Sequence, residues 1–234
     1  MYDQFELVQK RTFKTFLNFS FLILLLILIF FTILSTKYRV TNYEINRIES
    51  SSVVLNLGSL ESIKGESIWL VNESDFEKAI KENNTIENII FTKNLPNSLL
   101  IEIKEFESIA KIIDFRNSIP KNTILFKNQL EVENSSNDYQ LPLVTITNGP
   151  VAENFSGELV SFFVTLKKYN LNISDFSLVH NGSNLVGEFR GLSIYFGQPI
   201  DLGTKASVIG DFLSNKSCSG EIRFLTSEEI VSNC

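Results

Sequence analysis

The segment IENIIFTKNLPNSLLIEIKE, residues 86–105, contains two strand-like runs on either side of a turn. The first run, residues 86–93, contains three isoleucines, one phenylalanine and one threonine, residue types that favour strands. Residues 95–98, Leu-Pro-Asn-Ser, have the composition of a turn. Residues 99–105 alternate apolar and polar side chains with the period of two that a half-buried strand requires. The segment therefore predicts a β-hairpin.

The sequence before this hairpin predicts a strand and two helices. Residues 38–48 alternate loosely enough for a strand, and residues 50–65 are irregular with one short helix. Ser74 and Glu77 have the spacing of a capping box, and apolar residues at helical spacing follow them. The predicted order is strand, helix, helix, strand, strand, which makes a small α+β unit with its helices on one face of a short sheet.

A membrane-spanning helix is predicted near the N-terminus. Residues 16–34 contain no charged side chain, and a helix of about 19 residues spans roughly 28 Å, the thickness of the hydrocarbon core. The run is too long for the apolar part of a signal peptide, and no small-x-small cleavage site follows it. The basic residues flanking it slightly favour a cytoplasmic N-terminus. These are Lys10, Arg11 and Lys14 before the run, and Lys37 and Arg39 after it.

The charge of the chain argues against nucleic-acid binding. The formal net charge is -6 and the isoelectric point is about 5.0, whereas nucleic-acid affinity depends on clustered lysine and arginine. Outside the N-terminal residues 1–36 the chain carries 18 basic and 25 acidic residues, a charge of -7. We expect a region with this charge to stand off from an anionic membrane surface.

The sequence after residue 108 predicts a mixed β-domain with helices. Two segments have buried helical stripes, and the rest consists of short strands separated by Asn, Gly, Ser and Pro. The predicted helices are residues 155–169 and 201–213. The predicted strands are residues 109–115, 124–126, 130–132, 176–180, 185–189, 192–196 and, last, 221–225.

The hairpin sequence resembles the FtsQ/DivIB family of bacterial cell-division proteins. Residues 91–105 are similar to that family's pattern of a strand, Pro-Asn-x-Leu and an alternating strand ending in Glu, although residues 106–108, Phe-Glu-Ser, replace its Arg-Pro step. Further similarity lies in residues 65–72, Gly-Glu-Ser-Ile-Trp-Leu-Val-Asn, and around Gly197, Asp201, Lys205 and residues 220–223. The family's Val-x-Gly-Asn step after the first strand is not evident.

The resemblance implies a domain plan and a function. The plan is a cytoplasmic tail (1–15), a transmembrane helix (16–36), a POTRA-like domain (37–107), a β-domain (108–227) and a tail (228–234). The implied function is a non-enzymatic scaffold at the division septum of the plasma membrane, with its C-terminal domain outside. It would bind FtsB/FtsL-like bitopic proteins by β-augmentation at the edge of the β-domain.

The resemblance also implies the residues that bind the partner: Ile222, Arg223, Phe224 and Thr226. Arg223 offers a forked donor and Phe224 a rigid apolar anchor, two residue types enriched at interaction hot spots. Because alternate side chains of a strand face opposite sides, Ile222 and Phe224 could instead simply pack into the core. The sequence leaves this alternative open.

Two other functions remain open at this stage. The chain could be an anchored extracytoplasmic enzyme or ligand-binding protein, or a POTRA-bearing secretion accessory. The only histidine, His180, is expected at the surface beside a turn, and Glu102 and Glu105 are expected to be solvated on opposite faces of a strand. No cofactor, metal, nucleic acid or small-molecule substrate is expected.

Three further side chains carry predictions about structure. Trp69, the only tryptophan, is expected to pack inside the first outer domain. Cys218 and Cys234 could close a loop of about 15 residues in a disulfide, or remain two free thiols.

Overall fold

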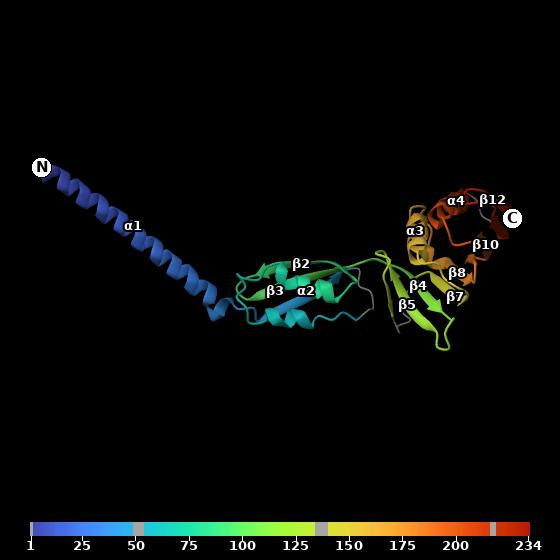
Figure 1. Ribbon diagram of the computed structural model, residues 1–234, viewed down its shortest axis with the longest axis horizontal. Coiled ribbons are helices and arrows are strands. Elements are labelled where there is room, and N and C mark those ends of the chain that lie inside the picture. Colours follow the sequence, from blue (N-terminus) through green and yellow to red (C-terminus); the bar gives the residue numbers. More distant parts are fainter. Residues whose placement is uncertain (1, 49–53, 134–139, 216–218) are drawn as a thin grey trace. The chain divides into compact units, whose positions relative to one another are not determined.

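The computed structural model describes residues 2–48, 54–133, 140–215 and 219–234, and it divides into two compact units. Figure 1 shows the order of the elements along the chain. The first unit comprises Met1–Ile48 and Asn56–Lys104, and the second comprises Glu49–Leu55 and Glu105–Cys234. Each unit is described by itself below.

The N-terminal helix α1 (Tyr2–Leu34) contains one segment, Phe16–Ile33, that is long and apolar enough to cross a membrane. None of this segment is buried against the rest of the protein. A soluble protein would cover such a surface, whereas a lipid bilayer solvates it. In the described part of the chain it is the single candidate span, as the sequence predicted.

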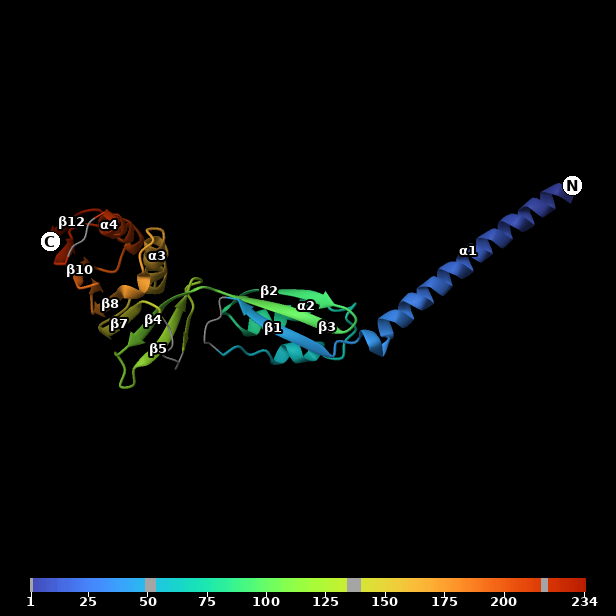
Figure 2. The ribbon, with the colours of Figure 1, turned by 180° about the vertical axis from the view of Figure 1, so that it is seen from behind.

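The first unit contains a three-stranded sheet in the order β1–β3–β2, with β1 parallel to β3. The strands are β1 (Asn42–Ile48), β2 (Ile86–Asn94) and β3 (Ser98–Glu105), and Figure 2 shows them side by side. Burial alternates along β3, where Leu99, Ile101 and Ile103 are covered. The buried side chains of a short 3-10 helix, η2 (Gly58–Ile63), and of α2 (Ser74–Glu82) complete the core. The hairpin and the order of elements predicted from the sequence are confirmed.

The start of α2 differs from the predicted capping box. Ser74 makes no capping bond to the helix, and its hydroxyl instead donates to the side-chain oxygen of Asn72 at 2.5 Å. That oxygen also accepts from the Ser74 amide at 2.9 Å, while the Asp75 carboxylate accepts from the Asn72 amide at 2.8 Å. Asn72 and Asp75 therefore form a reciprocal pair two residues earlier than predicted, since an Asn oxygen caps as well as a Ser hydroxyl.

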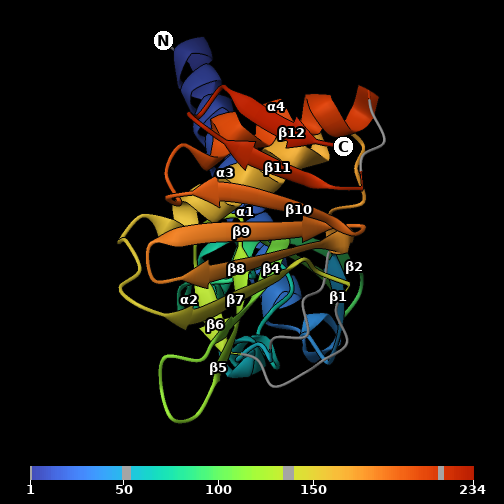
Figure 3. The ribbon, with the colours of Figure 1, turned by 90° about the vertical axis from the view of Figure 1, so that its right-hand side faces the viewer.

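The second unit contains a nine-stranded mixed sheet in the order β12–β11–β10–β9–β8–β7–β4–β5–β6. Figure 3 shows the strands of this sheet lying next to one another from β12 onward. Pairing is parallel at β4/β7, β7/β8 and β10/β11 and antiparallel elsewhere. The strands are β4 (Ser108–Asp114), β5 (Lys121–Phe126), β6 (Glu131–Glu133), β7 (Leu143–Asn148), β8 (Phe176–Asn181), β9 (Asn184–Phe189), β10 (Leu192–Gly197), β11 (Glu221–Phe224) and β12 (Ile230–Asn233).

Two helices, α3 (Phe155–Lys167) and α4 (Leu202–Asn215), pack against each other and share one core with the sheet. Phe162 lies at the centre of this core, with edge-to-face contacts to Phe163, Phe176 and Phe196 at centroid distances of 5.1, 6.0 and 5.2 Å. Such pairs stabilise a core beyond the burial of their area. The predicted fold class is confirmed: α+β, with an N-terminal apolar helix, a small first unit of helices on a three-stranded sheet, and a mixed β-domain with two helices.

Two strands of the second unit were not predicted. β7 lies in the middle of the sheet, and β12 pairs antiparallel with β11 at one end of it. The prediction that residues 221–225 form the last strand is therefore wrong, because residues predicted as a tail continue the sheet.

Three side chains lie in other environments than predicted. His180 is only 2% exposed, because its side of β8 faces the core, where its ring lies 5.2 Å from that of Phe155. Glu105 is fully buried at the end of β3 rather than solvated. Trp69 is 47% exposed rather than packed inside the first unit.

Candidate interaction site

β11 lies inside the sheet rather than at its edge, between parallel β10 and antiparallel β12. Gly220, which precedes the strand, allows β12 to approach closely. A Cβ atom at Gly220 would lie 1.8 Å from the carbonyl oxygen of Asn233, far inside contact distance. The end of β12 therefore requires a glycine at this position.

The alternation of β11 separates the predicted partner-binding residues onto two faces. Ile222 is completely buried and belongs to the core between the sheet and the two helices. Phe224 lies on the same face, partly exposed, with its ring stacked on Phe196 at 5.4 Å. Ile222 therefore has a packing role, while Phe224 keeps some accessible surface at the margin of the core.

Arg223 points to the opposite, outer face of the sheet. Its guanidinium carbon lies 4.7 Å from the centre of the Tyr195 ring, and its Nη2 lies 3.3 Å from a carboxylate oxygen of Glu221. The side chain is 63% exposed, so neither contact removes it from solvent. Stacking on a ring leaves several guanidinium N–H donors free to point outward.

Tyr195 and Arg223 belong to a row of side chains that crosses five strands of the outer face. The strand registers pair Val179 with Val186, Val186 with Tyr195, Tyr195 with Arg223, and Arg223 with Val231. Every member is at least partly exposed. We call these five residues the outer row. It is an accessible apolar surface with one cation, ending at the edge strand.

A polar row runs beside the outer row, two residues along each strand. It carries two carboxylates, Glu188 and Glu221, and the strand registers define its members as Ser177, Glu188, Ser193, Glu221 and Asn233. An apolar row next to an acidic one favours a partner whose strand or helix alternates apolar and basic side chains.

Thr226 stabilises the turn between β11 and β12. Its hydroxyl oxygen accepts hydrogen bonds from the amides of Glu228 and Glu229, at 3.3 and 3.1 Å. The Leu225 amide donates to the Glu229 carbonyl at 2.9 Å, which closes the turn. The Thr226 side chain therefore has a clear structural role in addition to any role in binding.

β12 forms the edge of the sheet. Among the residues that the structure describes, no strand pairs with its second side. Such an edge presents a row of backbone donors and acceptors to another chain. Cys234, next to β12, is disulfide-bonded, whereas Cys218 lies outside the described residues.

Sequence reasoning located β11 and Arg223 but missed the rest of this surface. The outer row is assembled from segments up to about fifty residues apart, so no local pattern reveals it. For β12 a signal existed: Ile230 and Val231 are strand formers four residues after the turn residue Thr226.

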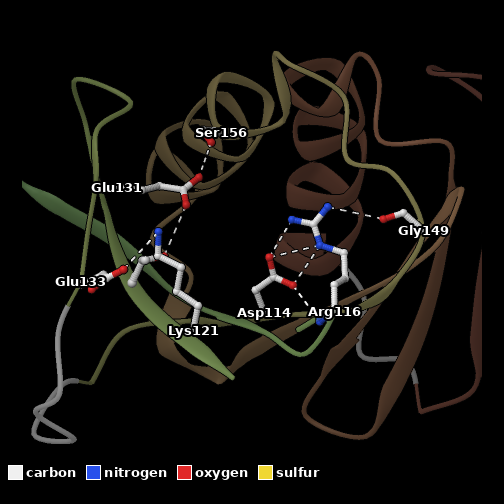
Figure 4. A network of polar contacts seen from close by, with 8 residues as sticks. Asp114, Arg116, Lys121, Glu131, Glu133, Gly149 and Ser156 are labelled. Atoms are coloured by element: carbon white, nitrogen blue, oxygen red, sulfur yellow. Dashed lines mark hydrogen bonds and ion pairs between the residues drawn. The ribbon is translucent and has the colours of Figure 1, made fainter. Parts of the chain in front are cut away.

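A second polar cluster lies at the β4–β5–β6 end of the same sheet (Figure 4). Arg116 binds the Asp114 carboxylate, with Nη2 and Nε at 2.6 and 2.9 Å from its oxygens, and donates to the Gly149 carbonyl at 3.4 Å. This hydrogen bonding lowers the pKa of Asp114, so the carboxylate stays ionised and paired. Nearby, the Ser156 hydroxyl donates to Glu131 at 2.5 Å and joins α3 to β6. The contacts of this cluster connect neighbouring elements of the fold.

Lys205 is a buried cation that connects α4 to the end of β10. Its ammonium donates to the carbonyl oxygens of Phe196 and Gln198, both at 2.8 Å. Burial lowers the pKa of Lys205, and the carboxylates of Asp201 and Glu158 partly oppose this. The ammonium thus satisfies carbonyls at the turn that leads from β10 to α4.

The first unit has a surface groove of about 550 Å³ between α2 and β2. Its lining includes the apolar rings of Phe76 and Phe91 and the carboxylates of Glu73 and Glu77. Glu77 is paired with Lys81 at 3.2 Å, one turn along the helix. This groove is the place where the ligand-binding alternative would be tested first.

Comparison with known proteins gives consistent matches. The family model "POTRA domain, FtsQ-type" matches residues 45–106. A Clostridium acetobutylicum protein named "Cell division protein DivIB" is 27% identical over 173 residues, which cover 70% of this chain and 68% of the relative. A Geobacillus kaustophilus protein of the same name is 30% identical over 111 residues, covering 47% of this chain and 41% of the relative.

Proposed function

Because the chain belongs to the FtsQ/DivIB family of bacterial cell-division proteins, we propose that it is a bitopic scaffold that binds other single-span division proteins through β12 and the outer row. The family membership gives the role in cell division and assigns protein–protein interactions within the division machinery. FtsB/FtsL-like proteins are the proposed partners.

The observation that supports this proposal is the edge of β12 beside the outer row, with which no strand in the described part of the chain pairs. A partner strand added to β12 would satisfy its free backbone donors and acceptors, which supplies affinity without regard to sequence. Val231 would then lie next to the partner's side chains, while Arg223 lies one strand further in on the same face and would bind only partner side chains that reach across β12; both would choose among partners. Phe224 contributes its partly exposed edge, whereas Ile222 and Thr226 would act by holding β11 and its turn in place.

The proposal includes a topology. The N-terminal residues 1–15 lie in the cytoplasm, the apolar segment Phe16–Ile33 of α1 spans the plasma membrane, and both folded units lie outside at the division septum. The basic residues before the span support this orientation. The POTRA-like domain would extend over residues 37–107 and the β-domain over residues 108–227, with β12 supplied by the segment after it.

A site-specific cross-linking experiment in dividing cells tests the proposal. A photo-reactive amino acid is placed at Val231 or Phe224 in the full chain, and the captured proteins are identified by mass. We expect capture of small single-span division proteins. Arg223→Glu should abolish the capture, because it removes the forked guanidinium donor from the outer row and puts a charge of the opposite sign in its place.

Arg190→Glu is a matched control for Arg223→Glu. Arg190 also stacks on a ring, with its guanidinium carbon 5.1 Å from the centre of Phe189, and also pairs with a carboxylate, Asp175. Its side chain is 62% exposed. Capture that survives Arg223→Glu, or that Arg190→Glu removes equally, would contradict the proposed surface.

A further inference from the structure

The segment that follows α1 is held firmly to the first unit. The Ile68 amide donates to the Tyr38 carbonyl at 2.7 Å, and the Val40 amide donates to the Glu66 carbonyl at 2.8 Å. The Gly65 amide donates back to the Val40 carbonyl at 2.9 Å. Residues 38–40 therefore form a short antiparallel pairing with residues 65–68, and the position of one segment fixes the other.

Exposed apolar side chains gather around this pairing. Trp69 is 47% exposed and Leu70 is 58% exposed, and the Trp69 ring lies 5.8 Å from that of Tyr38. Leu95, in the β2–β3 turn, is 56% exposed. The same turn is joined to the juxtamembrane segment, because the Thr41 amide donates to the Asn97 carbonyl at 3.0 Å. We call Tyr38, Trp69, Leu70 and Leu95 the juxtamembrane patch.

The tether to α1 keeps this patch close to the membrane. Three residues lie between Leu34, where α1 ends, and Tyr38, so the four Cα-to-Cα steps can span at most about 14 Å even when fully extended. The interfacial layer on each side of the hydrocarbon core is roughly 5 to 8 Å thick. A patch fixed to Tyr38 therefore cannot move far from the headgroups, whatever the orientation of the unit.

The chemistry of the patch matches a membrane interface. Tyrosine and tryptophan are enriched at the headgroup level, where one part of the ring is dry and the other wet. Three cations, Lys37, Arg39 and Lys93, lie in the same segments, and the Lys93 ammonium lies 3.5 Å from the Trp69 carbonyl oxygen. Although the whole outer region carries a charge of -7, this corner is locally basic, so anionic headgroups would attract it.

We propose that the juxtamembrane patch inserts into the headgroup layer of the leaflet at which α1 ends, so that lipid covers Trp69, Leu70 and Leu95. The surface that covers the patch is the bilayer that α1 spans, because the short segment between Leu34 and Tyr38 holds the patch permanently beside that bilayer. The first unit is then a membrane-docked base rather than a freely hinged one. The proposal needs α1 to span the bilayer, but it does not depend on partner binding at β12.

Trp69 is a natural probe of the proposal, since the chain contains one tryptophan. The full chain is reconstituted into vesicles of phosphatidylcholine and phosphatidylglycerol, with and without lipids brominated near the headgroup end of the acyl chains. We expect brominated lipids to quench most of the Trp69 emission and the bilayer to protect it from aqueous acrylamide. The double variant Leu70→Glu with Leu95→Glu, which keeps the probe, should lose both effects.

The matched control is Ile48→Glu with Ile90→Glu, two exposed isoleucines of the same unit. Ile48 lies at the other end of β1, about 20 Å along the strand from Asn42 at roughly 3.3 Å per residue. This variant should be quenched like the original chain. Amide exchange of β3 verifies that both variants are folded.

Three results would overturn the proposal. The first is emission that brominated lipids leave unchanged while acrylamide quenches it freely. The second is protection from acrylamide without quenching by brominated lipids, which means that protein rather than lipid covers the patch. The third is an equal loss of quenching in the control variant, which means that insertion does not depend on the patch.

Discussion

Truncating the two neighbouring residues Ile222 and Arg223 should separate the packing role of β11 from its binding role. Ile222 is completely buried in the core of the second unit. Replacing a buried isoleucine by alanine costs about 2 to 5 kcal/mol, so we expect Ile222→Ala to lower the local free energy of unfolding by about 3 kcal/mol.

Arg223→Ala should cost much less stability. Its contact with Tyr195 is a cation–π contact at an exposed site, worth about 0.5 to 1 kcal/mol. Its pair with Glu221 is solvent-screened at side-chain exposures of 63% and 48%, and such pairs contribute close to nothing. The loss should therefore stay below about 1 kcal/mol. If Arg223 is an interaction hot spot, however, Arg223→Ala should weaken partner binding by about 2 kcal/mol or more.

Amide hydrogen exchange of the full chain in detergent micelles measures the stability difference. For exchange through local opening, about 3 kcal/mol corresponds to roughly 100-fold faster exchange in β10–β12, because each 1.4 kcal/mol is a factor of ten. Affinity is measured with the partner captured by cross-linking. Equal acceleration of exchange by both substitutions would refute the assignment of the two faces, and so would loss of binding by Ile222→Ala alone at unchanged exchange rates.

Three further outcomes follow from single side chains. Burial, with a smaller effect from Arg116, lowers the pKa of His180, so below about pH 6.5 the unfolded chain binds a proton that the folded chain does not. The free energy of unfolding should therefore fall as the pH decreases from that value. In denaturation curves recorded at several pH values, His180→Leu should reduce this dependence of the free energy of unfolding on pH. An unchanged dependence would contradict the buried position. Gly220→Ala should displace β12. Amide hydrogen exchange of residues 230–233 should then become faster, while that of β8 and β9 stays unaffected. Unchanged protection of residues 230–233 from exchange would contradict the close contact with Asn233. Cys234→Ser should lower stability by up to roughly 3 kcal/mol, the value for closing a loop of about 15 residues, and an identical midpoint with and without reductant would contradict a stabilising disulfide.

Much of the first unit was predictable because its signals are local. The turn at residues 95–98 and the alternation of β3 specify a hairpin wherever it is placed in a fold. The capping pair at α2 was predicted at the wrong residues, because Asn, Ser and Asp are all competent caps and only the path of the chain selects among them. The prediction that Trp69 is buried was wrong, because a run of apolar residues does not indicate which of its side chains face solvent.

The amino-acid sequence alone determined the candidate membrane span, the strand–helix–helix–strand–strand order and the resemblance to the FtsQ/DivIB family, since hydrophobic length, periodicity and turn chemistry are properties of contiguous residues. The tertiary structure alone decided which strand forms the edge of the large sheet, and that Val179, Tyr195, Arg223 and Val231 share one face. It also decided that His180 is buried. The physical reason is that strand order and register are set by packing between segments far apart in the chain, where the identity of a residue does not reveal its neighbours.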